Sequence, residues 1–441
     1  MAQEVKIQPA APTPDVGPVA EHRHEKLAFP EGFLWGTATA AYQVEGNNEH
    51  SDWWQWEKDN PTRVRAPSGL AADHYHRYEE DLNMAKELNT KLYRFSIEWA
   101  RIMPHENSID RHELEHYGNM LRACRVRGIK TMVTLHHFTL PQWIAEKGGW
   151  QWRGAARAFR EYARIMAAEY FELVDYWVTV NEPMVIVSQG YVTGVWAPGK
   201  KNYLSAYFVY RHLIAAHKGA YKAIHAEAKK RGAPVAVGAA NNLISLSAYN
   251  RHRFADRWYV AFMDWIWNHA FIDATKGTHD FLGVNYYFHQ RIDPGKKRIM
   301  GVIVDIREEQ RDMSDIGWEV FPAGLFDALL DFSNYKLPII ITENGIATKN
   351  EDRRARYIVS YIKELYHAVA AGIDVRGYCY WSLLDNFEWE KGFSASFGLI
   401  EVKQPSLERS FKPSSKVYAQ IAKENGIPHD LLRFVGHGAK L

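Results

Sequence analysis

Two glutamates stand in the sequence where no packing argument asks for a charge. Glu182 follows the β-branched run VTVN and precedes a proline, and Glu343 lies near the end of the similar run IIITEN. A facing pair of carboxyl groups can cleave a glycosidic bond, because one protonates the leaving oxygen while the other attacks the anomeric carbon or activates a water molecule. The alternative for Glu182 is a charge that only caps a loop.

This chemistry requires different environments for the two carboxyl groups. Arg94, in the run YRFSIEW, is the cation expected to keep Glu343 ionised. Glu182, beside aromatic groups and facing the negative charge of Glu343, is expected to be protonated at neutral pH. The pair is therefore a candidate acid and nucleophile, provided that the fold brings it together.

Eight short apolar runs alternate with amphipathic stretches, which is the rhythm of a parallel sheet built from βα units. The runs begin at Phe33, Lys91, Lys130, Asp175, Pro234, Asp280, Leu337 and Val375. Eight is the strand number of a barrel whose strand ends converge on one pocket. The sequence therefore predicts an α/β fold, a single (β/α)₈ TIM barrel, with Glu182 and Glu343 at one face.

Two of the intervening segments carry helical patterns. The segment DRHELEHYGNMLRACRVRGI has apolar residues three or four positions apart, followed by Gly128 as a C-terminal cap. The segment RARYIVSYIKELYHAVAAGI repeats this order and is followed by Gly372. Both segments are predicted to be helices packed outside a strand. The charged stretch after the sixth run, residues 293–315, is predicted to be a long loop with a short hairpin.

Composition and charge argue against several classes of protein, among them nucleic-acid-binding and membrane proteins. The 441 residues carry 54 basic and 52 acidic side chains with no long basic run, so no nucleic-acid partner is expected. No membrane span and no signal peptide are predicted, and a cytoplasmic location is the expectation. Cys124 and Cys379 are expected to be reduced core residues. Residues 1–26 are predicted to be a disordered tail, and residues 27–441 one (β/α)₈ catalytic domain.

The motifs VTVNEP, IITENG, FLGVNYY, GTATAAYQVEG, TLHHFTLPQW and WSLLDNFEW occur over nearly the whole chain, from about Phe29 to about Pro413. Together they resemble the family 1 glycoside hydrolases, the β-glucosidase and β-glycosidase family. The resemblance implies that Glu182 is the general acid and base, and that Glu343 is the nucleophile of a retaining mechanism. It implies no cofactor and no metal.

The resemblance also implies roles for further residues. Arg94, Asn285 and Tyr287 match groups that support the nucleophile. The positions that match sugar-binding groups of the family are Gln43, His137, Asn181, Trp381, Glu388, Trp389 and Phe397. Glu388 and Trp389 keep the pattern of members that act on neutral sugars, since a carboxylate there repels a phosphate.

The function expected from these residues is hydrolysis of non-reducing terminal β-D-glucosides, with β-galactosides and β-fucosides as further candidates, by double displacement through a covalent glycosyl-enzyme. The partner is then a small β-glycoside or oligosaccharide, and an oligomer is left open. The alternative is a catalytically weak or inactive sugar-binding relative of the same fold.

A metal enzyme is the other alternative, because DHYHRY and LHHF supply four imidazoles, those of His74, His76, His136 and His137. Adjacent residues on a strand point to opposite faces, so His136 and His137 cannot share one ion. No carboxylate or cysteine spacing of the metal-binding kind accompanies these histidines. The sequence therefore disfavours a metal centre.

Overall fold

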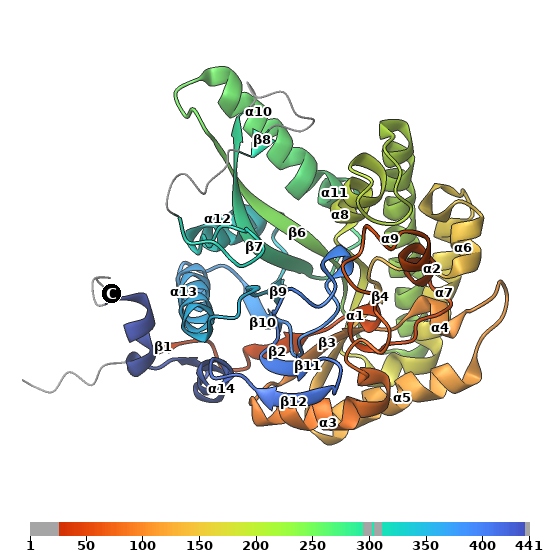
Figure 1. Ribbon diagram of the computed structural model, residues 1–441, viewed down its shortest axis with the longest axis horizontal. Helices are drawn as coiled ribbons and strands as arrows, with labels where there is room; N and C mark the ends of the chain where they lie inside the picture. The colour runs from red at the N-terminus through yellow and green to blue at the C-terminus, as the bar shows by residue number, and fades with distance from the viewer. Residues whose placement is uncertain (1–25, 294–301, 304–310, 437–441) are drawn as a thin grey trace, which may run out of the picture.

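A closed ring of eight parallel strands forms the centre of the computed structural model, which describes residues 26–293, 302–303 and 311–436 (Figure 1). Each strand pairs with the next along the chain, and the ring closes where β10 pairs with β2. The strands are β2 (Leu34–Ala38), β3 (Leu92–Ser96), β4 (Lys130–His136), β5 (Tyr176–Asn181), β6 (Val237–Ala248), β7 (Leu282–Asp293), β9 (Ile339–Asn344) and β10 (Val375–Trp381). The predicted (β/α)₈ barrel is confirmed.

The barrel is filled by side chains rather than by solvent. One buried cluster takes an apolar residue from nearly every strand, among them Leu92, Met132, Val178, Ile340 and Cys379. Such layers of inward side chains are the usual core of this fold. They close the bottom of the barrel, so that polar residues can gather only at the carboxyl ends of the strands.

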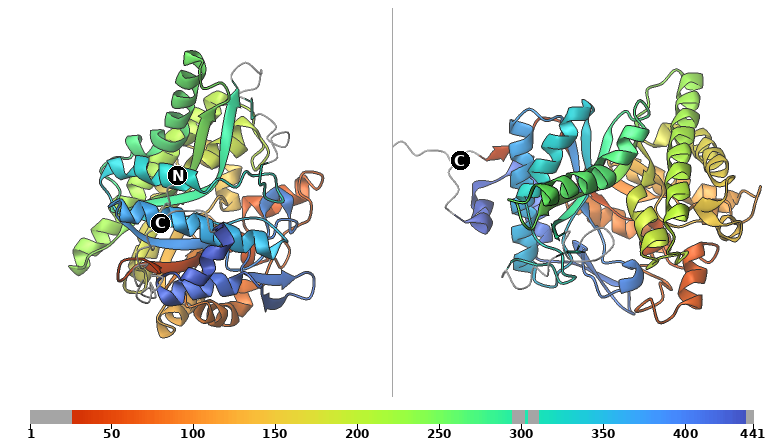
Figure 2. Two further views of the ribbon diagram at one scale, coloured as in Figure 1. Left: turned by 90° about the vertical axis from the view of Figure 1, so that its left-hand side faces the viewer. Right: turned by 90° about the horizontal axis from the view of Figure 1, so that it is seen from above.

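Helices cover the outside of the ring (Figures 1 and 2). The longer ones are α3 (His74–Glu87), α5 (Arg111–Val126), α7 (Ala155–Tyr170), α9 (Tyr203–Arg231), α10 (Phe254–Asp264), α12 (Ala323–Phe332), α13 (Glu351–Ala370) and α14 (Ser415–Glu424). The shorter ones are α1 (Ala41–Val44), α2 (Asp52–Asp59), α4 (Trp99–Ile102), α6 (Gln142–Glu146), α8 (Pro183–Val187) and α11 (Ala270–Ala274).

The two helices predicted from periodicity are α5 and α13, and both are confirmed. Asp110 caps α5 by accepting hydrogen bonds from the backbone N–H groups of His112 and Glu113. Gly128 and Gly372 follow the two helices with φ of 68° and 88°, a left-handed conformation that glycine adopts without steric cost.

Strands β6 and β7 continue well beyond the ring. Their predicted runs ended at Asn242 and Tyr287, yet pairing continues to Ala248 opposite Ile292. The two strands form a ribbon that rises above the barrel at the top of Figure 1, with α10 beside it. Strand β8 (Val302–Ile303) pairs antiparallel with the end of β7, which matches the predicted short hairpin. The remainder of the predicted loop, 294–301 and 304–310, lies outside the described residues.

Short strands tie other parts of the chain to the barrel. Strand β1 (Leu27–Ala28) pairs with β13 (Gly426–Ile427), which joins the start of the described chain to its end. Strands β11 (Ile400–Lys403) and β12 (Glu408–Phe411) form a hairpin. The predicted tail lies outside the described residues except for Lys26. Both cysteines are buried and free, as expected.

Within the part of the chain that the structure describes, no helix has the length and apolarity needed to cross a bilayer. The expected cytoplasmic location stays a prediction.

Candidate active site

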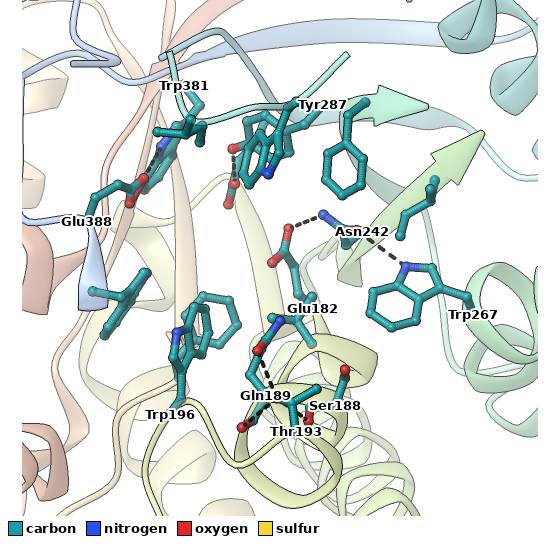
Figure 3. A pocket seen from close by; sticks show the side chains of 18 of the residues that line it. Glu182, Ser188, Gln189, Thr193, Trp196, Asn242, Trp267, Tyr287, Trp381 and Glu388 are labelled. Atoms are coloured by element: carbon teal, nitrogen blue, oxygen red, sulfur yellow. Dashed lines mark hydrogen bonds between the residues drawn. The ribbon is translucent and has the colours of Figure 1, made fainter. Parts of the chain in front are cut away.

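Glu182 lies at the junction between β5 and α8. Its backbone is left-handed, with φ 47° and ψ 62°, and Pro183 begins the helix immediately after it. A non-glycine residue in this conformation costs free energy that the surrounding structure must supply. The Glu182 N–H donates to the carbonyl of Ala240 at 2.7 Å, which holds this turn against β6. The junction directs the Glu182 side chain into the pocket (Figure 3).

Burial and charge alter the acidity of Glu182. The pKa of the Glu182 carboxyl is raised to about 8. The larger cause is its removal from water, and the second is the negative charge of Glu343. Hydrogen bonds oppose this shift: its Oε1 accepts from the side-chain amides of Asn285 at 2.7 Å and Asn242 at 3.0 Å. The carboxyl is therefore largely protonated at neutral pH.

Glu343 comes from the end of β9, and each of its oxygens has one strong donor. The Arg94 guanidinium donates to Oε1 at 2.5 Å, and the Tyr287 hydroxyl donates to Oε2 at 2.5 Å. Arg94 and Glu343 are both buried. A buried carboxylate that is paired with a guanidinium and accepts a hydroxyl hydrogen bond is stabilised in its charged form.

Asn285 and Asn181 connect the two carboxyl groups. The Asn181 side-chain oxygen accepts from Arg94 at 2.7 Å and from the Asn285 amide at 3.1 Å. Asn285 matches a group that supports the nucleophile; in the structure its amide donates to Glu182, and its oxygen accepts from Thr342 at 2.6 Å. The Thr342 hydroxyl therefore orients the Asn285 amide across the pocket. Arg94, Asn181 and Asn285 are fully buried behind the pocket wall.

A second group of polar residues lies across the pocket from Glu182. The Gln43 amide donates to Glu388 at 2.9 Å, and the Trp381 ring N–H donates to Glu388 at 3.4 Å. The His137 ring lies parallel to the Trp381 ring, 5.9 Å away between centroids, and Asn181 contacts His137 at 3.3 Å. Burial raises the pKa of Glu388 to about 8 and holds the pKa of His137 well below its ordinary range.

Two buried polar atoms in this group have no protein partner among the described residues, Oε1 of Gln43 and Nδ1 of His137. Buried polar atoms are normally hydrogen-bonded, so an unpaired one that lines a pocket is available to a polar group that enters it. One is an acceptor, and the neutral imidazole supplies a donor or an acceptor. Both can bind hydroxyl groups.

The pocket has a volume of about 450 Å³. Of the predicted site residues, the structure brings to its wall Gln43, His137, Glu182, Tyr287, Glu343, Trp381, Glu388, Trp389 and Phe397. Further lining residues were not predicted, among them Phe138, Trp196, Trp267 and Trp318. Asn242, at the polar end of the fifth predicted run, also lines the pocket.

The four histidines of the metal alternative have separate partners. His74 contacts Asp81 at 2.8 Å, His76 contacts Asp73 at 2.6 Å, and His136 accepts from the Trp150 ring N–H at 3.1 Å. His137 alone of the four lines the pocket. The structure does not bring the four imidazoles together.

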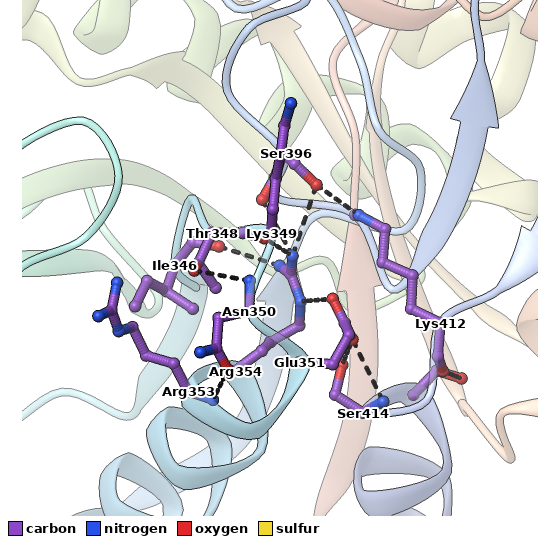
Figure 4. Close-up of polar contacts among 12 residues, drawn as sticks. Ile346, Thr348, Lys349, Asn350, Glu351, Arg353, Arg354, Ser396, Lys412 and Ser414 are labelled. Atoms are coloured by element: carbon purple, nitrogen blue, oxygen red, sulfur yellow. Dashed lines mark hydrogen bonds and ion pairs between the residues drawn. The ribbon is translucent and has the colours of Figure 1, made fainter.

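Arg354, at the start of α13, fixes the loops that follow β9 and β10 (Figure 4). Its side chain is fully buried and donates to the carbonyls of Ile346 at 3.0 Å and Phe397 at 2.9 Å. It also donates to the carbonyls of Thr348 and Ser396. The loops that carry Ile346 and Phe397 are therefore held by one side chain, and Phe397 is a wall of the pocket.

Replacing Arg354 with methionine is expected to lower the free energy of unfolding by about 3 to 5 kcal/mol, because several buried carbonyls lose their donors. Arg353→Met is the matched control: its partners Asp312 and Asp315 are surface groups, so a loss below about 1 kcal/mol is expected. Chemical denaturation of both variants measures the difference. Equal losses for the two variants would contradict the role of Arg354.

Comparison with known proteins identifies the family of the chain. The family model for glycosyl hydrolase family 1 matches residues 25–272 and 266–427. A beta-glucosidase A of Acetivibrio thermocellus is 32% identical over 450 residues, covering 91% of this chain and 99% of that protein. A beta-galactosidase of Pyrococcus woesei is 30% identical, covering 90% of this chain and 98% of that protein.

A solved structure, the beta-glycosidase from Pyrococcus horikoshii, is 34% identical and superposes with a TM-score of 0.88, covering 95% of this chain and all of that chain. The likeness therefore extends over the barrel and its loops together. The chain belongs to glycosyl hydrolase family 1 and is an O-glycoside hydrolase of the β-glucosidase type.

Proposed function

We propose that the protein is a retaining β-glycosidase that removes non-reducing terminal β-D-glucose, with Glu343 as the nucleophile and Glu182 as the general acid and base. The observation that carries this proposal is the contrast between the two carboxyl groups. Glu182 is buried with its pKa raised to about 8, whereas both oxygens of Glu343 accept hydrogen bonds from Arg94 and Tyr287. A protonated acid facing a supported carboxylate is what double displacement requires.

The first step forms a bond between a Glu343 oxygen and the anomeric carbon. The bond from that carbon to the leaving oxygen breaks at the same time, and Glu182 gives its proton to the leaving oxygen. In the second step Glu182, now ionised, takes a proton from water. The water oxygen attacks the anomeric carbon and releases Glu343 as a carboxylate, so two inversions give net retention.

Arg94 and Tyr287 matter in both steps because the charge of Glu343 changes. Their hydrogen bonds stabilise the carboxylate before attack and again as it leaves. Their positions also orient the attacking oxygen, since each donor is itself packed in the barrel. Asn285 is assigned here to Glu182, whose carboxyl oxygen it contacts.

The sugar is proposed to bind among Gln43, His137, Trp381 and Glu388. The unpaired atoms of Gln43 and His137 supply hydrogen bonds for hydroxyl groups, and the Trp381 ring supplies an apolar face for the C–H side of the ring. Asn181 lies behind His137 and orients it through their contact at 3.3 Å. Gln43 and Glu388 can serve either configuration at C4, so galactosides and fucosides are proposed as further substrates.

Hydrolysis of 4-nitrophenyl β-D-glucoside, followed by NMR in real time, tests the proposal. The β-anomer of glucose is expected to appear first and to equilibrate with the α-anomer afterwards. Rates with the β-galactoside and β-fucoside rank the sugars. First appearance of the α-anomer would contradict retention, and no turnover of any substrate would favour the inactive sugar-binding alternative.

A further inference from the structure

We infer that the outer half of the pocket selects β-glucosides whose aglycone is apolar, an alkyl or aryl group, over those whose aglycone is a second sugar. This inference rests on the proposed function, because it takes Glu182 as the group that protonates the leaving oxygen. It concerns the part of the pocket formed by the ribbon of β6 and β7 and by α10.

The position of the aglycone follows from the contacts of Glu182. The Trp267 ring N–H donates to the Asn242 side-chain oxygen at 3.3 Å, and the Asn242 amide donates to Glu182 at 3.0 Å (Figure 3). The acid is therefore tied to the ribbon side of the pocket, away from Gln43 and Glu388. A group that leaves from Glu182 lies against the wall that Asn242 and Trp267 begin.

That wall continues outward along the ribbon as an apolar surface. Alternate residues of a strand face the same side, and Asn242, Ile244 and Leu246 of β6 all line the pocket. Phe288 of β7 lines it on the neighbouring strand, and Met263 adds an apolar side chain from α10.

The opposite face of the ribbon holds further polar residues. There His289 contacts Glu319 at 2.7 Å and Ser247 at 2.8 Å, away from the pocket. The ribbon is thus polar toward the protein and largely apolar toward the aglycone. A sugar aglycone, which carries many hydroxyl groups, would instead require a polar face toward the pocket.

Polar groups in the outer half, and in the segment after α8 that also lines the pocket, mostly have protein partners. Asn242 uses both its amide and its oxygen on protein partners, and the Thr193 hydroxyl donates to the Gln189 side-chain oxygen at 3.1 Å. Gln290 is a second polar residue of the ribbon, besides Asn242, that lines the pocket. A second glucose would bring hydroxyl groups against Ile244 and Leu246, where burial without a hydrogen bond is unfavourable. An alkyl chain would gain from the same contact.

A series of n-alkyl β-D-glucosides, from methyl to octyl and below the micelle concentration, tests the inference with the wild-type enzyme. The leaving alcohols have nearly the same basicity, so differences in kcat/KM report contacts of the chain. We expect kcat/KM to rise about two- to fourfold per methylene until the pocket is filled. The kcat/KM of octyl glucoside is expected to exceed that of cellobiose.

Equal kcat/KM values across the series with active enzyme, or a preference for cellobiose, would overturn the inference while leaving the proposed function intact. Failure to hydrolyse any glucoside would instead overturn the proposed function.

Leu246→Gln locates the effect, with Leu330→Gln as the matched control, because Leu330 is a half-exposed leucine on α12 that does not line the pocket. The first variant is expected to lose about tenfold in kcat/KM for octyl glucoside and to keep the wild-type value for methyl glucoside within about twofold. The control should match wild type on both. If Leu246→Gln changes both substrates equally, or neither, the ribbon does not bind the aglycone.

Discussion

Replacing Glu343 with alanine is expected to lower hydrolysis of every β-glucoside by at least about 10⁴-fold. Two other carboxyl groups near Glu343 are held in different positions: Glu182 accepts from Asn242 and Asn285 on the opposite side, and Glu388 accepts from Gln43 and Trp381. The loss should be independent of the leaving group, since both poor and activated substrates need the same nucleophile. Steady-state rates with alkyl and aryl glucosides measure it.

Rescue of Glu343→Ala by an added nucleophile is the control for this variant, because the missing carboxylate leaves space for a small anion. Azide or formate can enter beside Arg94 and Tyr287, which keep their positions, and attack the anomeric carbon in place of Glu343. A single displacement inverts the configuration, so the rescued product is expected to be the α-glycosyl azide or formate. Rescue with a β-product, or substantial activity without added nucleophile, would show that Glu343 is not the nucleophile. Matching thermal midpoints for variant and wild type separate lost chemistry from lost folding.

The barrel could be predicted because each of its strands is a short apolar run with a polar residue at its carboxyl end. In a parallel sheet these ends share one edge, so Glu182 and Glu343 had to meet once both were placed on barrel strands. The pattern also located Arg94, whose strand lies in the same ring and whose guanidinium contacts Glu343. The order of the strands along the chain, together with the closure of the sheet into a ring, thus determined which residues gather at most of the pocket.

The position of a residue on a strand could not predict the direction of its side chain. Asn285 sits beside Glu343 in the strand register, yet its amide donates to Glu182 because the Thr342 hydroxyl donates to its oxygen. Which of two neighbours an amide contacts depends on such third partners, and these are not visible in a motif.

The extent of the ribbon was also missed. The residues ISLSA, from Ile244 to Ala248, alternate apolar and polar, which is compatible with a strand, but the barrel needs only the residues before them. Its continuation depends on pairing with β7 and on cover from α10, both of which are long-range contacts. Trp267 was missed for the same reason, since its role follows from the distance between its ring N–H and Asn242 rather than from its neighbours in sequence.

Replacing Glu182 with glutamine is expected to lower kcat/KM about 10²- to 10⁴-fold for alkyl glucosides and only slightly for 2,4-dinitrophenyl glucoside. Alkoxide leaving groups require a proton in the first step, whereas dinitrophenolate does not. Because kcat/KM reports this first step, the comparison isolates the acid role from the later base role. Equal losses on both substrates would contradict it.

The pH dependence of kcat/KM gives a second measure of the same carboxyl. Glu182 acts as an acid only when protonated, and its pKa is raised to about 8, so activity on alkyl glucosides should fall tenfold per pH unit above about pH 8. Glu388 also has its pKa raised to about 8 and could produce a similar limb. The two are distinguished by variants: Glu388→Gln should keep the alkaline limb at a lower overall rate, whereas Glu182→Gln should remove it. An alkaline limb that persists in Glu182→Gln and disappears in Glu388→Gln would assign the titration to the sugar-binding side of the pocket, and Glu182 would then lose its place as the acid.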